Sequence, residues 1–248
     1  MDDLLITVLI VGFVAQLIDG SLSMGYGVAS SSMLLGLGLP PATASACVHL
    51  AEVFTTGVSG TFHLKIGNVD RSLFWKLALP GVIGAVLGAY VLTALPASTA
   101  KPFVAVYLLI AGVVIIRKAL TQAIEKKKIT DKIVPLGLVG GFLDASGGGG
   151  WGPIVASNLV ARGRKPRKAI GSAILAEFFV ALAASLTFLA TVGFREWKIL
   201  ACLVVGGVLA APLGAYMCRR IPARVVMIII GLLVIVFGLR AISLAFSL

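Results

Sequence analysis

Long apolar segments make up most of the chain, and only short polar stretches separate them. Six of these segments are 19 to 26 residues long, and they cover residues 42–64, 73–95, 102–120, 168–193, 198–218 and 224–246. A helix rises 1.5 Å per residue, so each segment is long enough to cross a hydrocarbon core of about 30 Å. The pattern predicts six transmembrane helices, three in each half of the chain.

Two further apolar runs lead up to Asp19 and Asp144, and small residues interrupt the chain directly after them. The second run, Ile133–Asp144, has 12 residues and would extend about 18 Å as a helix, just past the bilayer centre. We expect each interruption to be the tip of a helical hairpin that enters the membrane and returns. A cleavable signal peptide would begin with positive charge, whereas this chain begins with two aspartates, so we expect residues 4–18 to be retained.

The sequence also matches itself at an offset of 125 residues, which becomes 126 after one inserted residue. The matched pairs include Asp19 with Asp144, Gly25 with Gly150, Pro41 with Pro166, Glu52 with Glu177, Gly88 with Gly214, and Pro96 with Pro222. So many matches in one register predict two homologous halves, residues 1–120 and 133–248. The charged linker 121–132 joins them.

Composition excludes most soluble classes. Hydrophobic residues make up 59% of the chain, charged residues make up 12%, and the mean hydropathy is +1.07. A soluble fold of this size could not bury so much apolar surface, so we expect the lipid bilayer to be its solvent. The net charge of +11 lies in short loops and does not indicate nucleic-acid binding. The three cysteines lack the spacing of a zinc site or a disulfide framework, and we expect neither a metal nor a cofactor.

The basic residues orient the chain. Seventeen of the 21 Lys and Arg lie in four loops, which are Lys65–Lys76, Arg117–Lys132, Arg162–Lys168 and Arg219–Arg224. These loops fall on one side if each half makes three crossings and one returning hairpin. Positive charge marks the cytoplasmic side. We therefore predict a cytoplasmic linker and an outside N-terminus, in the inner (plasma) membrane of a bacterium.

Three crossings per half would place the two halves in opposite orientations. The exit of the second hairpin, Ala161–Lys168, carries five positive charges, whereas the matching Leu35–Ala42 carries none. The predicted fold is an all-α integral membrane protein with two inverted-topology repeats, each a broken-helix hairpin plus three transmembrane helices. Secondary transporters that work by alternating access have this architecture.

The glycine-rich break Asp144–Pro153 and the hairpin exit Leu35–Ala44, together with the paired halves, resemble the TauE/SafE family of sulfite and organosulfonate exporters. The resemblance covers nearly the whole chain, although the first break, Gly20–Gly27, departs from the glycine run of the second. The resemblance implies an anion carrier of the bacterial inner membrane. Composition and spacing alone imply a transporter without identifying its substrate.

Only four acidic residues lie inside apolar segments, and they form two repeat-related pairs: Asp19 with Asp144, and Glu52 with Glu177. A charged side chain at mid-membrane costs about 2.5–3.5 kcal/mol on insertion scales, so each is a functional candidate. We assign these four acids, together with His49, to proton coupling. The alternative is that an acid only caps or bridges backbone at a helix break.

The two breaks are the candidate substrate site. If helices restart after Gly27 and Gly152, their N-termini would point toward the centre and favour an anion. The residues expected to bind a small anionic substrate there are Ser21, Ser23, Gly25, Tyr26, Ser146, Gly149, Gly150 and Trp151. The serines would donate hydroxyl groups, and the two aromatic residues would wall the pocket. Packing at a helix end is the alternative role for Tyr26 and Trp151.

One helix face in the first half is polar, since Ser45, His49, Glu52, Thr56 and Ser59 follow a helical spacing. In the second half only the glutamate is retained, so the first half could carry an additional proton path. His49 could equally be a hydrogen-bonded packing residue. His63 is expected near the cytoplasmic end, in contact with water. Small-residue stripes such as Gly81, Gly84 and Gly88 predict close helix packing.

The leading hypothesis is a proton-linked secondary carrier that exports sulfite or an organosulfonate. A proton-coupled cation or metal exporter is the first alternative, because buried carboxylates and His49 are natural cation ligands. A membrane subunit that only assembles with others is an alternative of another class. No nucleophile–base pair or nucleotide-binding loop is present, so we predict that the protein is not an enzyme. The oligomeric state is open.

Overall fold

The computed structural model describes residues 2–121, 132–218 and 223–246. Within these ranges every regular element is a helix. The first half contains α1 (Asp2–Leu22), α2 (Tyr26–Gly36), α3 (Pro41–Lys65), α4 (Arg71–Ala94) and α5 (Ala97–Thr121). The second half contains α6 (Ile133–Gly147), the π-helix η1 (Gly152–Ala156), α7 (Ser157–Ala161), α8 (Pro166–Thr191), α9 (Trp197–Met217) and α10 (Ala223–Phe246). The predicted all-α membrane fold is confirmed.

Six described helices are long and apolar enough to cross a membrane, but they are not the six that we expected. The set contains α1, α4, α5, α8, α9 and residues 227–244 of α10. The helix α3 is as long as its neighbours, but its buried polar residues exclude it from this set by composition. The helix α1 enters the set because it runs for 21 residues and does not stop at Asp19.

The hairpin breaks lie slightly further along the chain than expected. The helix α1 continues past Asp19 to Leu22, and α6 continues past Asp144 to Gly147, so the expectation that each helix ends at its aspartate is wrong. Left-handed backbone then turns the chain, with φ of 138° at Gly25 and 133° at Gly149. Glycine tolerates such angles because it has no Cβ. Helix resumes at Tyr26 and Trp151, two residues earlier than predicted.

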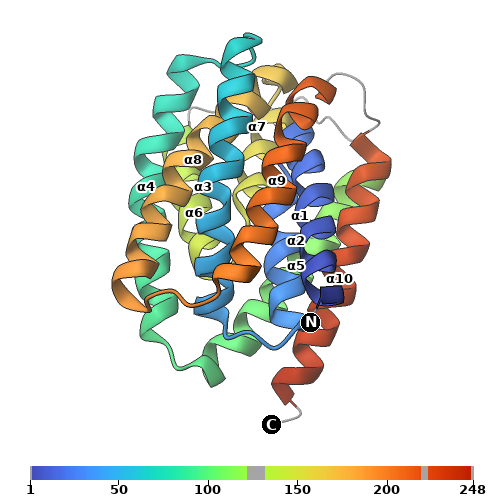
Figure 1. Ribbon diagram of the computed structural model, residues 1–248. Coiled ribbons are helices and arrows are strands. Elements are labelled where there is room, and N and C mark those ends of the chain that lie inside the picture. Colours follow the sequence, from blue (N-terminus) through green and yellow to red (C-terminus); the bar gives the residue numbers. More distant parts are fainter. Residues whose placement is uncertain (1, 122–131, 219–222, 247–248) are drawn as a thin grey trace.

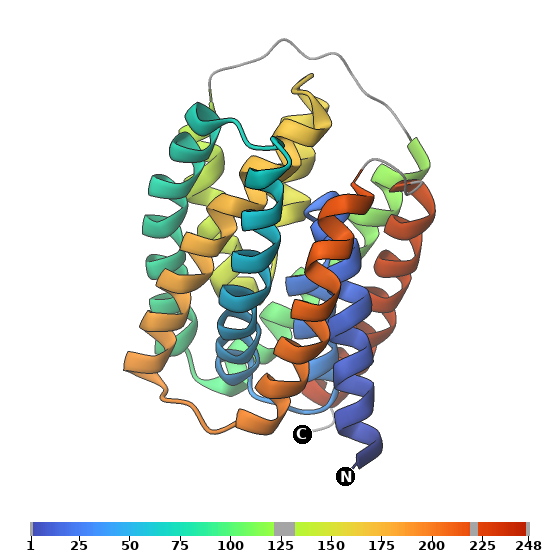
Figure 2. The ribbon, with the colours of Figure 1, turned by 45° about the horizontal axis from the view of Figure 1, so that its top comes forward.

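The two halves are interleaved. The helix α1 packs along α9, and α6 packs along α4, so the first arm of each hairpin contacts the other half. The helices α3 and α8 pack together in the interior, and α5 packs along α10 (Figure 1). Figure 2 shows that α1 begins at the lower end, where the N-terminus is marked, whereas α6 begins at the upper end. The first helices of the two halves, α1 and α6, therefore run in opposite directions. The boundaries and the homology of the two repeats stay a prediction.

The small-residue stripes allow these close contacts, as predicted. A Cβ on Gly84 or Gly88 would meet the main chain of α6 at Leu138 and Phe142. A Cβ on Gly214 would lie 3.0 Å from the Cα of Gly20 in α1. Where apolar side chains have no solvent-driven reason to associate, such backbone approach supplies the van der Waals packing.

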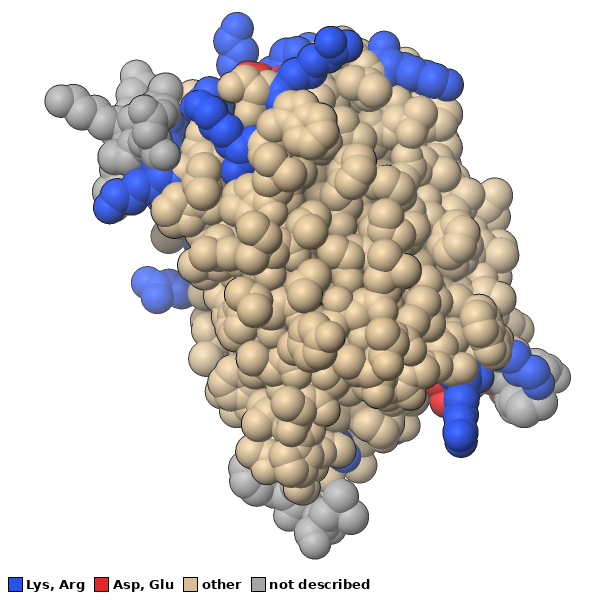
Figure 3. Space-filling view, turned by 90° about the vertical axis from the view of Figure 1, so that its left-hand side faces the viewer, with Lys and Arg blue, Asp and Glu red and all other residues tan. Residues whose placement is uncertain are grey.

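The surface has the character of a membrane protein. Figure 3 shows Lys and Arg gathered at the upper end, fewer charges at the lower end, and a broad, almost uncharged middle. Large apolar side chains in the interior of the long helices are exposed: Leu79 in α4 and Leu209 in α9 are each 61% exposed. Helices that are apolar on both faces need lipid around them.

Candidate functional site

The two helix breaks meet at the centre of the molecule. A Cβ on Gly27 would lie 3.0 Å from the Cα of Gly149, and a Cβ on Gly149 would collide with the main chain of Gly27 and Val28. The same Cβ on Gly27 would lie 2.9 Å from Oε1 of Glu52. Glycine at these positions thus lets the backbones of the two halves cross beside a buried carboxylate.

Both aspartates cap the helices that restart after the breaks. Oδ1 of Asp144 accepts hydrogen bonds from the amides of Gly150 (2.7 Å) and Trp151 (2.9 Å). Oδ1 of Asp19 accepts a longer one from the amide of Tyr26 (3.4 Å). The capping role that the sequence left open is therefore present in both halves. An anion at these N-termini would have to share the first-turn amides with a carboxylate.

The three candidate serines differ in what remains available to a ligand. Ser21 donates its hydroxyl to the carbonyl of Ile18 (2.8 Å), and Ser146 donates to the carbonyl of Phe142 (2.7 Å). Both bonds stay within the serine's own helix. Ser23 is fully buried, and its Oγ has no partner among the described residues. Of the three, Ser23 is therefore the serine whose hydroxyl is not committed to a described backbone carbonyl.

Tyr26 and Trp151 anchor the breaks to neighbouring helices. The Tyr26 hydroxyl donates to the carbonyl of Leu203 in α9 (3.1 Å), and Nε1 of Trp151 donates to the carbonyl of Ala173 in α8 (3.0 Å). Both side chains are at most 1% exposed. These bonds agree with the packing alternative, because each aromatic ring fills space between helices.

A histidine–carboxylate pair joins α3 of the first half to α6 of the second half. Nε2 of His49 lies 3.3 Å from Oδ2 of Asp144, and Nδ1 of His49 lies 2.8 Å from the carbonyl oxygen of Ser45. The Ser45 hydroxyl donates to the carbonyl of Ala145 (3.0 Å), which further links the two helices. His49 is fully buried, and Asp144 is 1% exposed.

Glu52 completes a cluster with this pair. One ligand atom from each of His49, Glu52 and Asp144 can be chosen so that all three lie within 4.8 Å of one another. Glu52 is 1% exposed, and neither of its carboxylate oxygens has a hydrogen-bond partner among the described residues. Such a carboxylate is costly to bury, so it indicates a bound ion, a proton or water.

The two remaining candidate acids, Asp19 and Glu177, lie outside that cluster. Oδ2 of Asp19 and Oε2 of Glu177 are likewise buried without a described partner. The structure thus brings three of the five proton-coupling candidates into one cluster.

Several polar residues near the breaks were missed by the sequence analysis. Ser30, Ser31 and Ser32 of α2 are buried with unpartnered hydroxyl groups, as is the side-chain amide of Gln16 in α1. Tyr107 of α5 lies against both Gly147 and Gly150. The run of three serines inside an apolar segment was a signal in the sequence. Nothing in the sequence indicated that Tyr107 lies at the break, because only the tertiary fold brings α5 to it.

His63 is the clearest error in the polar face of α3. It was expected to contact water, but it is fully buried. Its Nε2 lies 2.8 Å from the carbonyl oxygen of Gly20, and its Nδ1 lies 3.1 Å from Nδ2 of Asn68. Arg167 of the second half donates twice to Oδ1 of Asn68, at 2.9 and 3.1 Å. The loop after α3 and the start of α8 enclose the ring.

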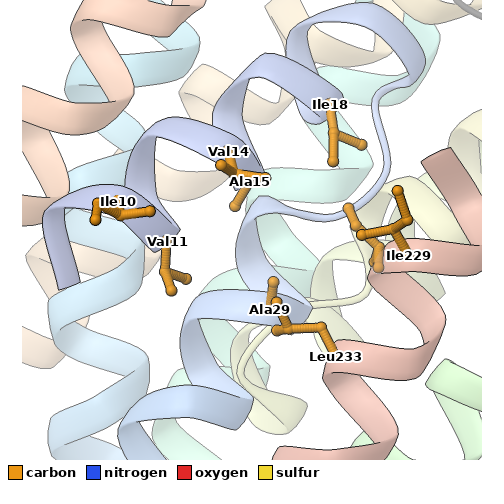
Figure 4. A pocket seen from close by; sticks show the side chains of 9 residues that line it. Ile10, Val11, Val14, Ala15, Ile18, Ala29, Ile229 and Leu233 are labelled. Carbon is orange, nitrogen blue, oxygen red and sulfur yellow. The ribbon is translucent and has the colours of Figure 1, made fainter. Parts of the chain in front are cut away.

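A pocket of about 120 Å³ lies elsewhere, between α1, α2 and α10. Its lining consists only of apolar side chains, among them Ile18, Ala29 and Leu233 (Figure 4). Such a lining cannot select an ion, so the polar centre remains the candidate site.

Comparison with known proteins agrees with this architecture. The family model described as Sulfite exporter TauE/SafE matches residues 8–241. A protein of Bacillus subtilis (strain 168), "Probable membrane transporter protein YtnM", is 42% identical over 245 residues, which cover 95% of this chain and 82% of that protein. No solved structure matches the chain. With its apolar helices, the protein is a multi-pass membrane transporter, and the chain belongs to the TauE/SafE sulfite exporter family.

Proposed function

We propose that the protein is a secondary transporter that exports a small sulfur oxyanion, such as sulfite or an organosulfonate, by alternating access. The observation that carries this proposal is the crossing of two helix breaks, at Gly27 and Gly149, beside the buried carboxylate of Glu52. Irregular backbone at the interface of two repeats is where secondary transporters bind their substrates. The family description supplies the substrate class.

The opposite directions of α1 and α6 support the alternating-access mechanism. Because α1 packs on α9 and α6 packs on α4, the first arm of each hairpin is tied to a helix of the other half. Rocking of one such group against the other would open the crossing of the breaks to each side in turn.

The charges at the site support a link to protons. Four buried carboxylates would repel an oxyanion if all were ionised, since like charges interact strongly where water is excluded. A proton on Glu52, whose oxygens lack partners, would remove one such charge and provide a donor. We propose that the anion binds together with a proton at this cluster.

Charge at the two ends supports the orientation. The loop between α3 and α4 and the loop between α7 and α8 lie at the same end, where the Lys and Arg of Figure 3 are densest. By the positive-inside rule this end faces the cytoplasm, and the N-terminus faces outward.

Flux through reconstituted liposomes tests the proposal. The panel is sulfite, a short organosulfonate, a carboxylate of similar size and divalent metal ions, each with and without a proton gradient. Flux of sulfite or sulfonate that the gradient accelerates is the expected result. Flux of metal ions alone would establish the cation exporter instead, and no flux of any solute would favour an assembly subunit. Gly149→Leu, which closes the crossing of the breaks, is the inactive control.

A further inference from the structure

The surroundings of His49 determine which ring nitrogen carries a proton. Nδ1 lies 2.8 Å from the carbonyl oxygen of Ser45, which can only accept a hydrogen bond. The Ser45 hydroxyl is also near Nδ1 (3.2 Å), but its proton is directed to the carbonyl of Ala145. Nδ1 is therefore the protonated nitrogen of the neutral ring. Its Nε2 then presents a lone pair.

That lone pair faces a second acceptor. Oδ2 of Asp144 lies 3.3 Å from Nε2, while Oδ1 of the same carboxylate is held by the amides of Gly150 and Trp151. Two acceptors at this distance need a proton or a metal ion between or beside them. The unpartnered carboxylate of Glu52 lies within the same 4.8 Å cluster and adds a third acceptor.

We propose that His49 Nε2, Glu52 and Asp144 Oδ2 bind a divalent first-row transition metal ion. One imidazole nitrogen and two carboxylate oxygens are a donor set that such ions prefer, and the two negative charges match the charge of the ion. A metal-bound histidine usually donates its other ring N–H to a carbonyl or carboxylate, as His49 does toward Ser45. The amides on Asp144 orient the second ligand in the same way.

This metal site rests on the proposed function only for its role, because it lies beside the proposed substrate site. The site itself is inferred from the geometry of its side chains, which does not depend on the transported solute. Three protein ligands would leave at least one coordination position for a further ligand, and the Glu52 carboxylate lies beside Gly27, which adjoins Gly149. A metal ion there would neutralise the carboxylates and would favour an oxyanion at the crossing. A proton on Glu52 and the metal ion are thus alternative ways of removing the same negative charge.

The repeat provides a matched control. Glu177 aligns with Glu52 and is also buried, at 4% exposure. The position that aligns with His49 is Ile174, so the second half offers no imidazole to a metal. Glu177→Gln therefore removes an equivalent membrane carboxylate without removing a ligand of the proposed site.

Titration of Co²⁺ into the tag-free protein in detergent tests the proposal, with visible absorption and calorimetry as readouts. We expect one Co²⁺ per chain, with d–d bands and no thiolate charge-transfer band. Glu52→Gln and His49→Gln should each weaken binding by about tenfold or more, and Glu177→Gln should bind like the wild type. Gel filtration and circular dichroism establish whether each variant is folded. If one of the two ligand variants is misfolded, the other one still tests the proposal.

The proposal is overturned if the wild type binds no Co²⁺ at pH 7.5, which would mean that a proton alone bridges His49 and Asp144. Equal weakening in Glu52→Gln and Glu177→Gln would overturn it too, because charge and not the cluster would then govern binding. These results are independent of the liposome assay. Sulfite flux without Co²⁺ binding would contradict only the proposed metal site, and Co²⁺ binding without sulfite flux would contradict only the proposed export function.

Discussion

His49 and Asp144 are 95 residues apart in the chain, and Nε2 of one lies 3.3 Å from Oδ2 of the other. This contact joins α3 to the end of α6 directly before the second break. The carboxylate that pairs with the histidine also caps the helix that begins after the break. A change in the protonation of His49 or Asp144 would therefore act on the same carboxylate that holds the backbone of the break.

The double role of Asp144 can be separated by two substitutions. Asp144→Asn retains an oxygen that can accept from Gly150 and Trp151, whereas Asp144→Ala leaves both buried amides unpaired. Each unpaired amide costs about 1–3 kcal/mol. We expect Asp144→Ala to lower the apparent Tm in detergent clearly and Asp144→Asn to lower it little. Asp19→Ala, which loses one longer bond, should fall between them. Equal losses for the two Asp144 variants would show that charge and not the cap stabilises the break.

The two glycines of the second break should respond differently to alanine. A Cβ on Gly149 meets the main chain of Gly27 and Val28, and φ at Gly149 is 133°. Gly149→Ala should therefore abolish transport, and shortening a neighbouring side chain should not restore it. A Cβ on Gly150 meets the hydroxyl of Tyr107, and the next ring atom lies at 3.3 Å. Tyr107→Phe should therefore restore much of the loss in Gly150→Ala.

Transport rate per inserted protein is the measurement, with membrane insertion checked by fractionation. Failure of Tyr107→Phe to improve Gly150→Ala, or its improvement of Gly149→Ala, would contradict the geometry of the break. Gly238→Ala is the control, because that glycine has no positive φ and a Cβ there would make only ordinary contacts at 3.6 Å.

The orientation predicts one-sided labelling. Cysteines placed singly at Lys165 and Thr99, both exposed, should react with impermeant thiol reagents from the cytoplasmic side and the outer side respectively. The background needs Cys47, Cys202 and Cys218 replaced. Intact cells and inverted vesicles supply the two sides. Labelling of both positions from the same side would rule out the proposed topology.

The pH dependence of substrate binding distinguishes anion from cation chemistry. If oxyanion binding needs a proton on Glu52, wild-type sulfite affinity should increase as pH falls from about 8 to 5, because the like charge is removed. Glu52→Gln mimics the protonated form, so its affinity should remain high and vary less with pH. A chelator in the buffer keeps metal ions from supplying the same neutralisation.

Glu177→Gln is the companion variant in this pH series. If both glutamates carry protons during transport, Glu177→Gln should reduce the pH dependence of sulfite affinity as much as Glu52→Gln does. If only Glu52, beside the His49–Asp144 pair, carries a proton, the effect of Glu177→Gln should be much smaller. Loss of sulfite binding in Glu52→Gln at every pH would contradict the anion mechanism and would point to a carboxylate that binds a cation.

The sequence by itself determined the membrane class, the helical fold and the approximate position of both breaks. These features are encoded locally, since apolar length sets a transmembrane span and glycine permits a left-handed turn. The small residues of the stripe around Gly84 predicted close helix contact for a similar reason, because their spacing places them on one helix face. Buried acids such as Glu52 could be identified because charge in an apolar segment is conspicuous.

Only the tertiary structure decided which of these groups meet. Ser21 and Ser146 are satisfied within their own helices, His63 is enclosed by a loop and by α8, and His49 pairs with an acid from the other half. Helical periodicity shows which side chains share a face, but it contains no information on what packs against that face. The pairing of His49 with Asp144 arises from the packing of α3 against α6, and that packing depends on the whole arrangement of helices around them.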